Sequence, residues 1–207
     1  KWSELEWQIR NWLFTGWCSG DHIVEQHVHN LDVMNWAFGT HPVKCVGMGG
    51  RAARTDPMFG NIYDHFAVEF EYPNGVSVFS QSRQINGCQN LVGEHLVGTL
   101  GTSNCAGRID PTQGEKWRYR AESASAYRLT HEDLISSIAA GAPINEAQAI
   151  AESTMTGILG REAAYSGQAV TWEQAMKSES RLGPPSYDLK QAFAIPAVAM
   201  PGQYRFE

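Results

Sequence analysis

Residues 63–72 read YDHFAVEFEY, and this stretch decides the class of fold. Phe66, Val68, Phe70 and Tyr72 recur at every second position, so they share one face of an extended strand. The other face carries charged and polar residues. One apolar face and one solvated face are typical of a strand in an antiparallel sheet.

The neighbouring segments extend this sheet. Residues 73–75 (PNG) form a turn, and residues 76–84 return as the partner strand, with Val76 and Val78 pointing inward. The remaining predicted strands cover residues 44–54, 91–99 and 116–120, and the predicted helices cover residues 21–39, 130–141, 146–166 and 171–178.

This order of elements predicts an α+β fold, namely an open, mostly antiparallel β-sheet with helices packed on one face. We expect residues 1–182 to form one domain of this kind. Residues 183–207 are rich in proline, and we expect them to form an irregular tail packed on that domain.

Composition excludes several classes of protein. The 207 residues are 43% hydrophobic and 18% charged, which does not fit a disordered chain, and the net charge of -6 comes without a basic patch for nucleic acid. We expect neither a nucleic-acid nor a membrane partner, because no apolar stretch is long enough to span a bilayer. The chain begins with Lys1 and shows no signal peptide, so we expect a fragment or a processed product.

The four cysteines, at positions 18, 45, 88 and 105, form no CxxC pair. We expect them to be free thiols, which favours a cytoplasmic protein and keeps the periplasm as an alternative.

The densest polar cluster is residues 21–32, DHIVEQHVHNLD, which hold three of the seven histidines. In a helix, Glu25 and His29 are four residues apart and share a face, and Asp32 continues that stripe. A carboxylate beside an imidazole suits proton transfer, so we predict that Glu25 and His29 are catalytic. A buried histidine paired with an acid for structural reasons is the alternative.

The same cluster has a second interpretation as a metal site. Glu25, His27 and His29 could bind a divalent metal if the backbone were extended here, although a zinc site needs three or four ligands.

Other polar or aromatic residues are candidates for substrate binding. Trp17 belongs to an aromatic-rich segment that either lines a pocket or fills the core, and Arg83 lies on a strand where it could hold substrate hydroxyls or form surface ion pairs. The predicted substrate-binding residues are Trp17, Asp21, His22, His27, Asp32 and Arg83.

Residues 45–52, CVGMGGRA, look like a dinucleotide-binding fingerprint but lack its context. That fingerprint requires a helix directly after the glycines, and here the sequence TDP follows at residues 55–57. We therefore expect a strand in which the glycines permit close backbone approach, and no cofactor bound by this chain alone.

Residues 19–32 resemble the Gfo/Idh/MocA oxidoreductase family. That family has a glycine-rich turn, then an acid, a histidine four residues later and an aspartate three further on, which match Gly20, Glu25, His29 and Asp32. The segments that also resemble the C-terminal domain of this family are residues 41–43, 72–75, 98–102, 145–147 and 152–154.

The resemblance implies one half of a two-domain enzyme. In the family, an N-terminal Rossmann domain binds NAD or NADP and supplies a catalytic lysine. The C-terminal domain supplies the acid and histidine and most of the pocket for sugars, inositols or related polyols, and oligomers usually form through its sheet. Carried over, His29 transfers the proton, and Glu25 is its partner or a substrate ligand.

The chain departs from the family pattern in three respects. Glu25 stands where the family usually has aspartate, His27 stands where it usually has glycine, and the Rossmann half is absent. We therefore expect the substrate-binding and catalytic domain of an NAD(P)-dependent sugar or polyol dehydrogenase, completed by a Rossmann-domain partner or a lost N-terminal half. The alternatives are a stand-alone metal- or base-assisted lyase or isomerase acting on keto-sugars, and a non-enzymatic, self-associating sugar-binding module.

Overall fold

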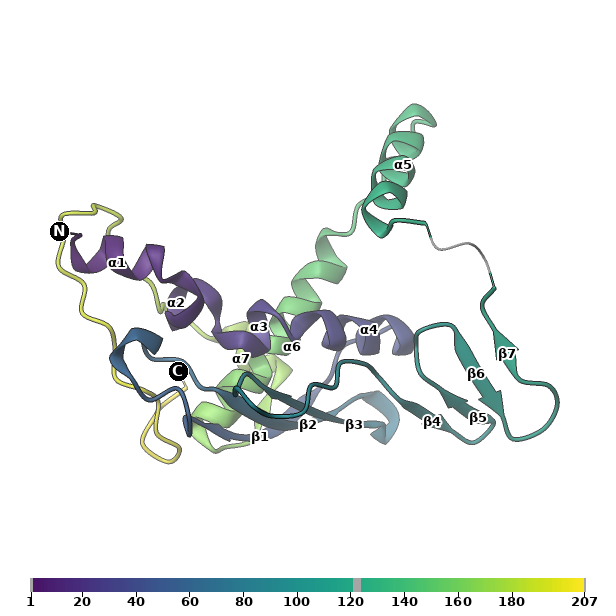
Figure 1. The fold of residues 1–207 in the computed structure, drawn as a ribbon, viewed down its shortest axis with the longest axis horizontal. Coiled ribbons are helices and arrows are strands. Elements are labelled where there is room, and N and C mark those ends of the chain that lie inside the picture. The colour runs from purple at the N-terminus through teal and green to yellow at the C-terminus, as the bar shows by residue number, and fades with distance from the viewer. Residues whose placement is uncertain (1, 121–123, 207) are drawn as a thin grey trace. The chain divides into compact units, whose positions relative to one another are not determined.

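The computed structural model describes residues 2–120 and 124–206, which form two compact units (Figure 1). The first unit comprises the residues up to Gln89 together with those from Glu152 onward. The second unit comprises Asn90–Ala151. Both contain an open antiparallel sheet, and helices accompany the sheets, so the predicted α+β class is confirmed.

The sheet of the first unit, here called sheet A, has the strand order β3-β2-β1-β8, and all neighbouring strands are antiparallel. Its strands are β1 (Lys44–Gly50), β2 (His65–Glu71), β3 (Ser77–Arg83) and β8 (Val170–Thr171). The prediction from residues 63–72 is confirmed, because Phe66, Val68, Phe70 and Tyr72 are all buried. The prediction for Val76 is wrong, since this residue precedes β3 and is 40% exposed.

The glycine-rich segment is strand β1, as expected. A Cβ atom at Gly49 would lie 2.6 Å from the carbonyl oxygen of His65, and one at Gly47 would lie 3.1 Å from the backbone nitrogen of Ala164. The glycines therefore permit close approach of β2 on one side and of a helix on the other.

The helices of the first unit are α1 (Glu4–Arg10), α2 (Gly16–Ser19), α3 (Asp21–Glu25), α4 (Val28–Phe38), α6 (Ala147–Ser166, from Glu152 onward in this unit) and α7 (Trp172–Lys177). Of these, α3, α4 and α6 contact the buried face of sheet A. Single 3-10 turns occur at Trp12–Phe14, Pro57–Phe59 and Pro73–Gly75. The predicted helices at residues 146–166 and 171–178 are confirmed, the latter with a capping box between Thr171 and Gln174.

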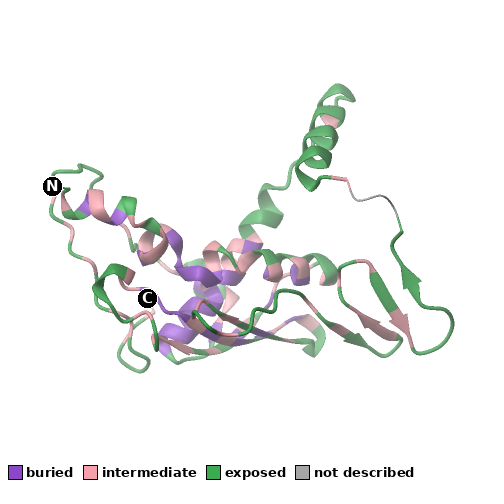
Figure 2. Cartoon of the chain, in the orientation of Figure 1, coloured by how far each residue is buried: buried purple, intermediate pink, exposed green. Residues whose placement is uncertain are grey.

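Helix α6 is the centre of the first unit. A Cβ atom at Gly157 would lie 3.2 Å from the carbonyl oxygen of Ile23 in α3, and one at Gly160 would lie 2.8 Å from the Phe70 ring in β2. These two glycines let α6 pack closely against both α3 and sheet A. Figure 2 shows the buried residues concentrated in this region.

The described part of the second unit contains a small sheet with the order β4-β5-β6-β7, helix α5 (Ala126–Ala139) and the first turn of α6. Its strands are β4 (Leu96–Gly98), β5 (Gly101–Ser103), β6 (Arg108–Pro111) and β7 (Trp117–Arg118). Strands β5 and β6 were not predicted, because three or four residues give little alternation to detect. The predicted helix start at Thr130 is wrong, since α5 begins at Ala126 and the Thr130 hydroxyl donates to the Ala126 carbonyl.

Residues 183–206 form turns and irregular backbone, without helix or strand. They are anchored to the first unit at several points. The Tyr63 hydroxyl donates to the Ala199 carbonyl (2.9 Å), the Tyr204 hydroxyl donates to Glu162 (2.8 Å), and the Gly202 N–H donates to the Ser166 carbonyl (3.0 Å). None of the described helices combines the length and apolar character needed to cross a membrane.

Candidate functional site

The polar cluster of residues 21–32 lies on helices α3 and α4, over the helix-facing side of sheet A (Figure 1). Two of its histidines reach the edge strand β3. His22 Nε2 is hydrogen-bonded to Ser82 Oγ at 3.0 Å, and His27 Nε2 is hydrogen-bonded to Ser80 Oγ at 2.7 Å. These two serines share the face of β3 that also carries Val78. The contacts tie α3 and the start of α4 to the edge of the sheet.

The predicted single helix over residues 21–39 is wrong, because a turn at Gln26 and His27 separates α3 from α4. The N–H groups of both Gln26 and His27 donate to the carbonyl of His22 (3.1 and 2.8 Å). In an unbroken helix, His22 and His27 would point about 140° apart around the axis. The turn allows both imidazoles to face β3.

His22 is buried. Burial lowers the pKa of its imidazole to about 4, and the neighbouring His27 lowers it as well. The ring is therefore neutral at neutral pH, and its Nδ1 atom is buried without a hydrogen-bond partner in the described structure. These contacts hold His22 inside the fold, and the substrate contact predicted for it stays a prediction.

Glu25 and His29 are differently placed. Glu25 is the half-buried last residue of α3, and His29 is exposed in the first turn of α4. The turn between the helices removes the i, i+4 relation on which the predicted pairing rested. Within the described part of the chain, neither side chain makes a hydrogen bond or an ion pair, so the His29 imidazole is available to an external ligand.

Asp32 connects α4 to α6. Its carboxylate accepts a hydrogen bond from Ser153 Oγ at 2.5 Å. Nearby, Asn35 Nδ2 donates to Thr156 Oγ1 (3.0 Å), and its Oδ1 accepts from the Tyr72 hydroxyl (2.6 Å). This network fixes the orientation of α4, and Asp32 itself is on the exposed side.

Asp21 begins α3 and is fully buried. Its backbone has the left-handed φ of 64°, which is uncommon for a residue with a side chain. Its Oδ2 atom accepts hydrogen bonds from the Tyr63 N–H (2.9 Å) and the Tyr165 hydroxyl (2.7 Å). Burial raises the pKa of Asp21 to about 6, although both hydrogen bonds act in the opposite direction.

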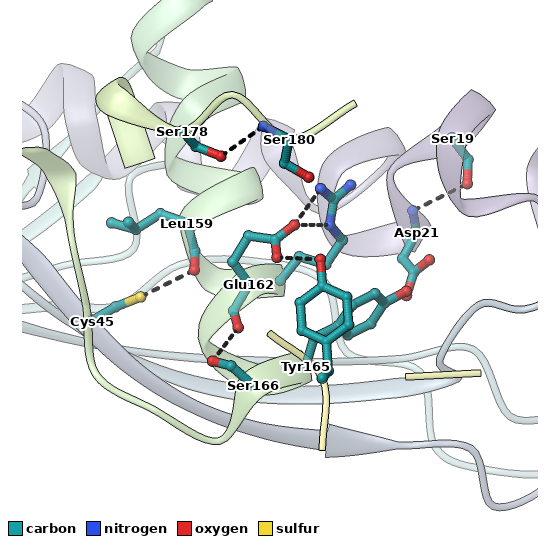
Figure 3. A network of polar contacts seen from close by, with 11 residues as sticks. Ser19, Asp21, Cys45, Leu159, Glu162, Tyr165, Ser166, Ser178 and Ser180 are labelled. Carbon is teal, nitrogen blue, oxygen red and sulfur yellow. Dashed lines mark hydrogen bonds and ion pairs between the residues drawn. The ribbon is translucent and has the colours of Figure 1, made fainter. Parts of the chain in front are cut away.

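Next to Asp21 lies an ion pair that the sequence analysis missed. Arg161 donates through Nε and Nη2 to Glu162 Oε1 (3.1 and 2.6 Å), and both side chains are almost fully buried. Figure 3 shows this network around Glu162 and Tyr165. The signal that could have revealed it is an adjacent arginine and glutamate within the otherwise mostly apolar residues 159–165, LGREAAY.

Trp17 contributes to the same region. Its Nε1 donates to Gln8 Oε1 (2.8 Å), and its ring packs against Tyr187 and Phe193 of the C-terminal segment. A cavity of about 70 Å³ lies here, lined by Gly16, Trp17, Asn61, Arg161, Tyr165, Leu182, Pro196, Ala197, Ala199 and Tyr204.

Arg83 lies on the opposite side of the sheet from the histidine cluster, and its predicted role in substrate binding stays a prediction. Arg83 is the last residue of β3 and pairs across the ladder with His65, whereas Ser82 faces the helices. Because successive residues of a strand point to opposite faces, Arg83 lies on the outer face of sheet A.

The metal site considered for Glu25, His27 and His29 required an extended backbone, whereas the backbone turns at Gln26 and His27. Gln26 has φ −117° and ψ −51°, and His27 has φ −71° and ψ −13°. Within residues 2–120 and 124–206, no three His, Cys, Asp or Glu side chains are grouped so as to hold a metal ion. All four cysteines are free thiols, as predicted.

No protein-family model and no curated protein matches this chain. Solved structures do share its fold. The aldose-aldose oxidoreductase of Caulobacter crescentus, complexed with glycerol, is 17% identical, with a TM-score of 0.62 over 77% of this chain and 50% of that one. The myo-inositol 2-dehydrogenase of Lactobacillus plantarum is also 17% identical, with a TM-score of 0.57 over 74% and 49% of the two chains.

A third similar structure is the WlbA dehydrogenase of Bordetella pertussis in complex with NADH and UDP-GlcNAcA. It is 15% identical, with a TM-score of 0.51 over 70% of this chain and 44% of that one. At these identities the likeness establishes the fold. The chain thus shares the fold of about half of each of these oxidoreductases, which agrees with the fold that the sequence resemblance implied. It spans about half the length of the structures that it matches.

Proposed function

We propose that this chain is the substrate-binding and proton-transfer half of an NAD(P)-dependent oxidoreductase that acts on a ring hydroxyl of a sugar or polyol. One observation carries the proposal. Ser82 and Ser80 of sheet A form hydrogen bonds with His22 and His27. His29, by contrast, is exposed, and the chain shares its fold with part of a sugar oxidoreductase.

In this proposal His29 removes the hydroxyl proton. Imidazole changes protonation near neutral pH, so it can take a proton from a substrate and return it to solvent in each cycle. Glu25, at the end of α3, acts as its partner or accepts a hydrogen bond from a neighbouring substrate hydroxyl. His27 and Asp32 flank His29 on α4 and the preceding turn, and they are the remaining substrate ligands on this side.

Oxidation of a hydroxyl also releases a hydride, and these side chains cannot accept it. The glycine-rich segment that could suggest a nucleotide site is strand β1, so this segment does not have the strand-turn-helix form of a dinucleotide fingerprint. We assign the hydride to NAD or NADP held by a separate Rossmann domain, as a partner chain or as another part of the same protein.

The similar structures support the proposed substrate class. They are named for an aldose and an inositol, and one holds glycerol. A neutral polyol also suits a surface that offers imidazole and carboxylate groups as hydrogen-bond acceptors.

We propose that the outer face of sheet A associates with a second copy of the chain. Val46 and Met48 of β1 and Phe79 of β3 lie on this face, and Met48 and Phe79 are 72% and 76% exposed. Covering these exposed apolar side chains with a second copy would remove their surface from water, which supports the proposal. A cytoplasmic location, with the periplasm as the alternative, stays a prediction.

The direct test of binding is to follow the histidine side-chain NMR signals while a panel of polyols is added to the chain. We expect the His29 signal to shift in a saturable way with at least one polyol, and the response to disappear in His29→Ala. His131, an exposed histidine of α5, is the internal control. A panel that leaves His29 unchanged, or moves His131 equally, would refute binding at this site.

A further inference from the structure

The small sheet of the second unit has one basic face. Arg108 and Asp110 are two residues apart in β6 and therefore share a face, and Arg118 of β7 lies directly opposite Arg108. Ile109 and Trp117, which also lie directly opposite each other, are on the other face. The pairing of β6 with β7 (Figure 1) thus separates charged from apolar side chains that alternate along the sequence.

The Asp110 carboxylate has three cations around it on this face. Arg108 Nη2 donates to Asp110 Oδ2 at 2.5 Å, and Lys116 Nζ lies 3.9 Å from Asp110 Oδ1. The hydrogen bond from Arg108 lowers the pKa of Asp110, and the charges of Lys116 and Arg118 act in the same direction. All three cations are therefore close enough to act on the same carboxylate.

These charges do not balance. Arginines directly opposite each other on neighbouring strands have Cβ atoms about 4.5–5.5 Å apart, and like charges in this position are unfavourable. Within the described residues, the Arg118 guanidinium forms no hydrogen bond or ion pair, and Arg118 is exposed. One carboxylate against three cations leaves two positive charges on this face, in a chain whose net charge is -6. A bound anion would relieve this repulsion.

The excess charge and the kind of cation select a phosphoryl group. A phosphate monoester carries about −1.5 to −2 charges at pH 7, which matches the excess more closely than a single carboxylate does. A guanidinium binds phosphate oxygens through two parallel N–H donors, and an ammonium adds a point charge. A nucleic acid, in contrast, is recognised by a longer basic patch or stripe.

We propose that the face formed by Arg108, Lys116 and Arg118 binds the phosphoryl group of a small molecule, with the unpaired Arg118 guanidinium as its main ligand. The site lies within the second unit and does not depend on the function proposed for His29.

An amide NMR titration of the full chain at low ionic strength tests this binding, with inorganic phosphate, glucose 6-phosphate and glucose as probes. We expect saturable shifts at Arg108, Asp110 and Arg118 with both phosphates and none with glucose. Tighter binding of glucose 6-phosphate would identify a phosphorylated small molecule as the ligand, and equal affinities would identify free phosphate. The absence of saturable shifts, or an equal response to chloride at the same ionic strength, would overturn the proposal.

Two variants change the charge of this face in opposite directions. Arg118→Gln should weaken phosphate binding about fivefold, because it removes the unpaired guanidinium. Asp110→Asn should strengthen binding about twofold, because it removes the negative charge and keeps an amide oxygen that can accept from Arg108. Arg181→Gln, at an exposed arginine of the first unit, is the matched control and should leave the affinity unchanged.

The same spectra show whether each variant is folded. A folded Arg118→Gln chain that binds phosphate as tightly as the wild type, or a folded Asp110→Asn chain that binds it more weakly, would also overturn the proposal.

Discussion

At the scale of single residues, the neighbours in sheet A decide what each histidine of the cluster can do. His22 and His27 are engaged by serines of β3, and His29 is exposed. The residue types and their spacing were enough to identify the cluster from the sequence. Their different surroundings could not be inferred, because Ser80 and Ser82 are more than fifty residues away and meet the histidines only in the folded chain.

Asp21 and His22 should give opposite pH dependences of stability. The pKa of Asp21 rises from 3.8 to about 6 on folding, so its ionisation destabilises the fold as the pH increases through this range. The pKa of His22 falls from 6.5 to about 4, so its protonation destabilises the fold as the pH decreases through the same range. Each pKa shift corresponds to at most about 3 kcal/mol in the free energy of unfolding. The two pH dependences have opposite sign and nearly cancel in the wild-type chain.

The conservative variants separate these two effects. Asp21→Asn should be more stable at pH 7 than at pH 4, because only the His22 contribution remains. His22→Gln should be more stable at pH 4 than at pH 7, because only the contribution of Asp21 ionisation remains. The groups that face Asp21 are Tyr63, Tyr165, Arg161 and Glu162. Urea unfolding at a series of pH values measures both, and slopes of the same sign in the two variants would contradict these assignments.

At the scale of elements, the strands and the long helix α6 follow local patterns, whereas the turn between α3 and α4 does not. Residues 63–72 alternate strictly and form β2 within a buried core. Residues 21–39 show apolar residues at helical spacing without an internal proline or glycine, so their sequence predicts one helix. The turn at His27 arises from tertiary contacts with β3, and local propensity is routinely overridden in this way.

Removing the hydroxyl of Ser80 should loosen this turn. Ser80→Ala deprives His27 Nε2 of its 2.7 Å hydrogen bond in a partly buried position, which should lower the free energy of unfolding by about 1 kcal/mol. Ser77→Ala, at the exposed start of the same strand, is the control and should change it by less than about 0.5 kcal/mol. Chemical denaturation measures both, and equal effects would show that the Ser80 hydroxyl does not hold the turn.

At the scale of the whole molecule, apolar surface is abundant. None of the described residues between Asn90 and Ala151 is buried, and the outer face of sheet A exposes Met48 and Phe79. The sequence predicts which residues are apolar, but it does not reveal which of them lack an internal partner. That distinction depends on how many elements pack against each face.

A charge on the outer face should prevent self-association. Phe79→Lys is expected to shift the chain toward the monomer, because it replaces an exposed apolar side chain of the proposed interface by a charge, while the exposed side chain contributes little to the fold. Val76→Lys, at an apolar residue just outside β3, is the matched control. Sedimentation velocity over a range of concentrations reads out the difference, and a wild-type chain that stays monomeric throughout would contradict the proposed interface.

The most direct test of the central claim is the turnover of native protein containing this chain and its cofactor-binding domain, with NAD or NADP and a panel of sugars and polyols. We predict reduction of the nicotinamide with at least one substrate, and a loss of 10² to 10⁴ in kcat for His29→Ala, the usual contribution of a general base. The stability of this variant should change little, because His29 is exposed. A His29→Ala protein that turns over as fast as the wild type would contradict the assignment of His29 as the proton-transfer residue.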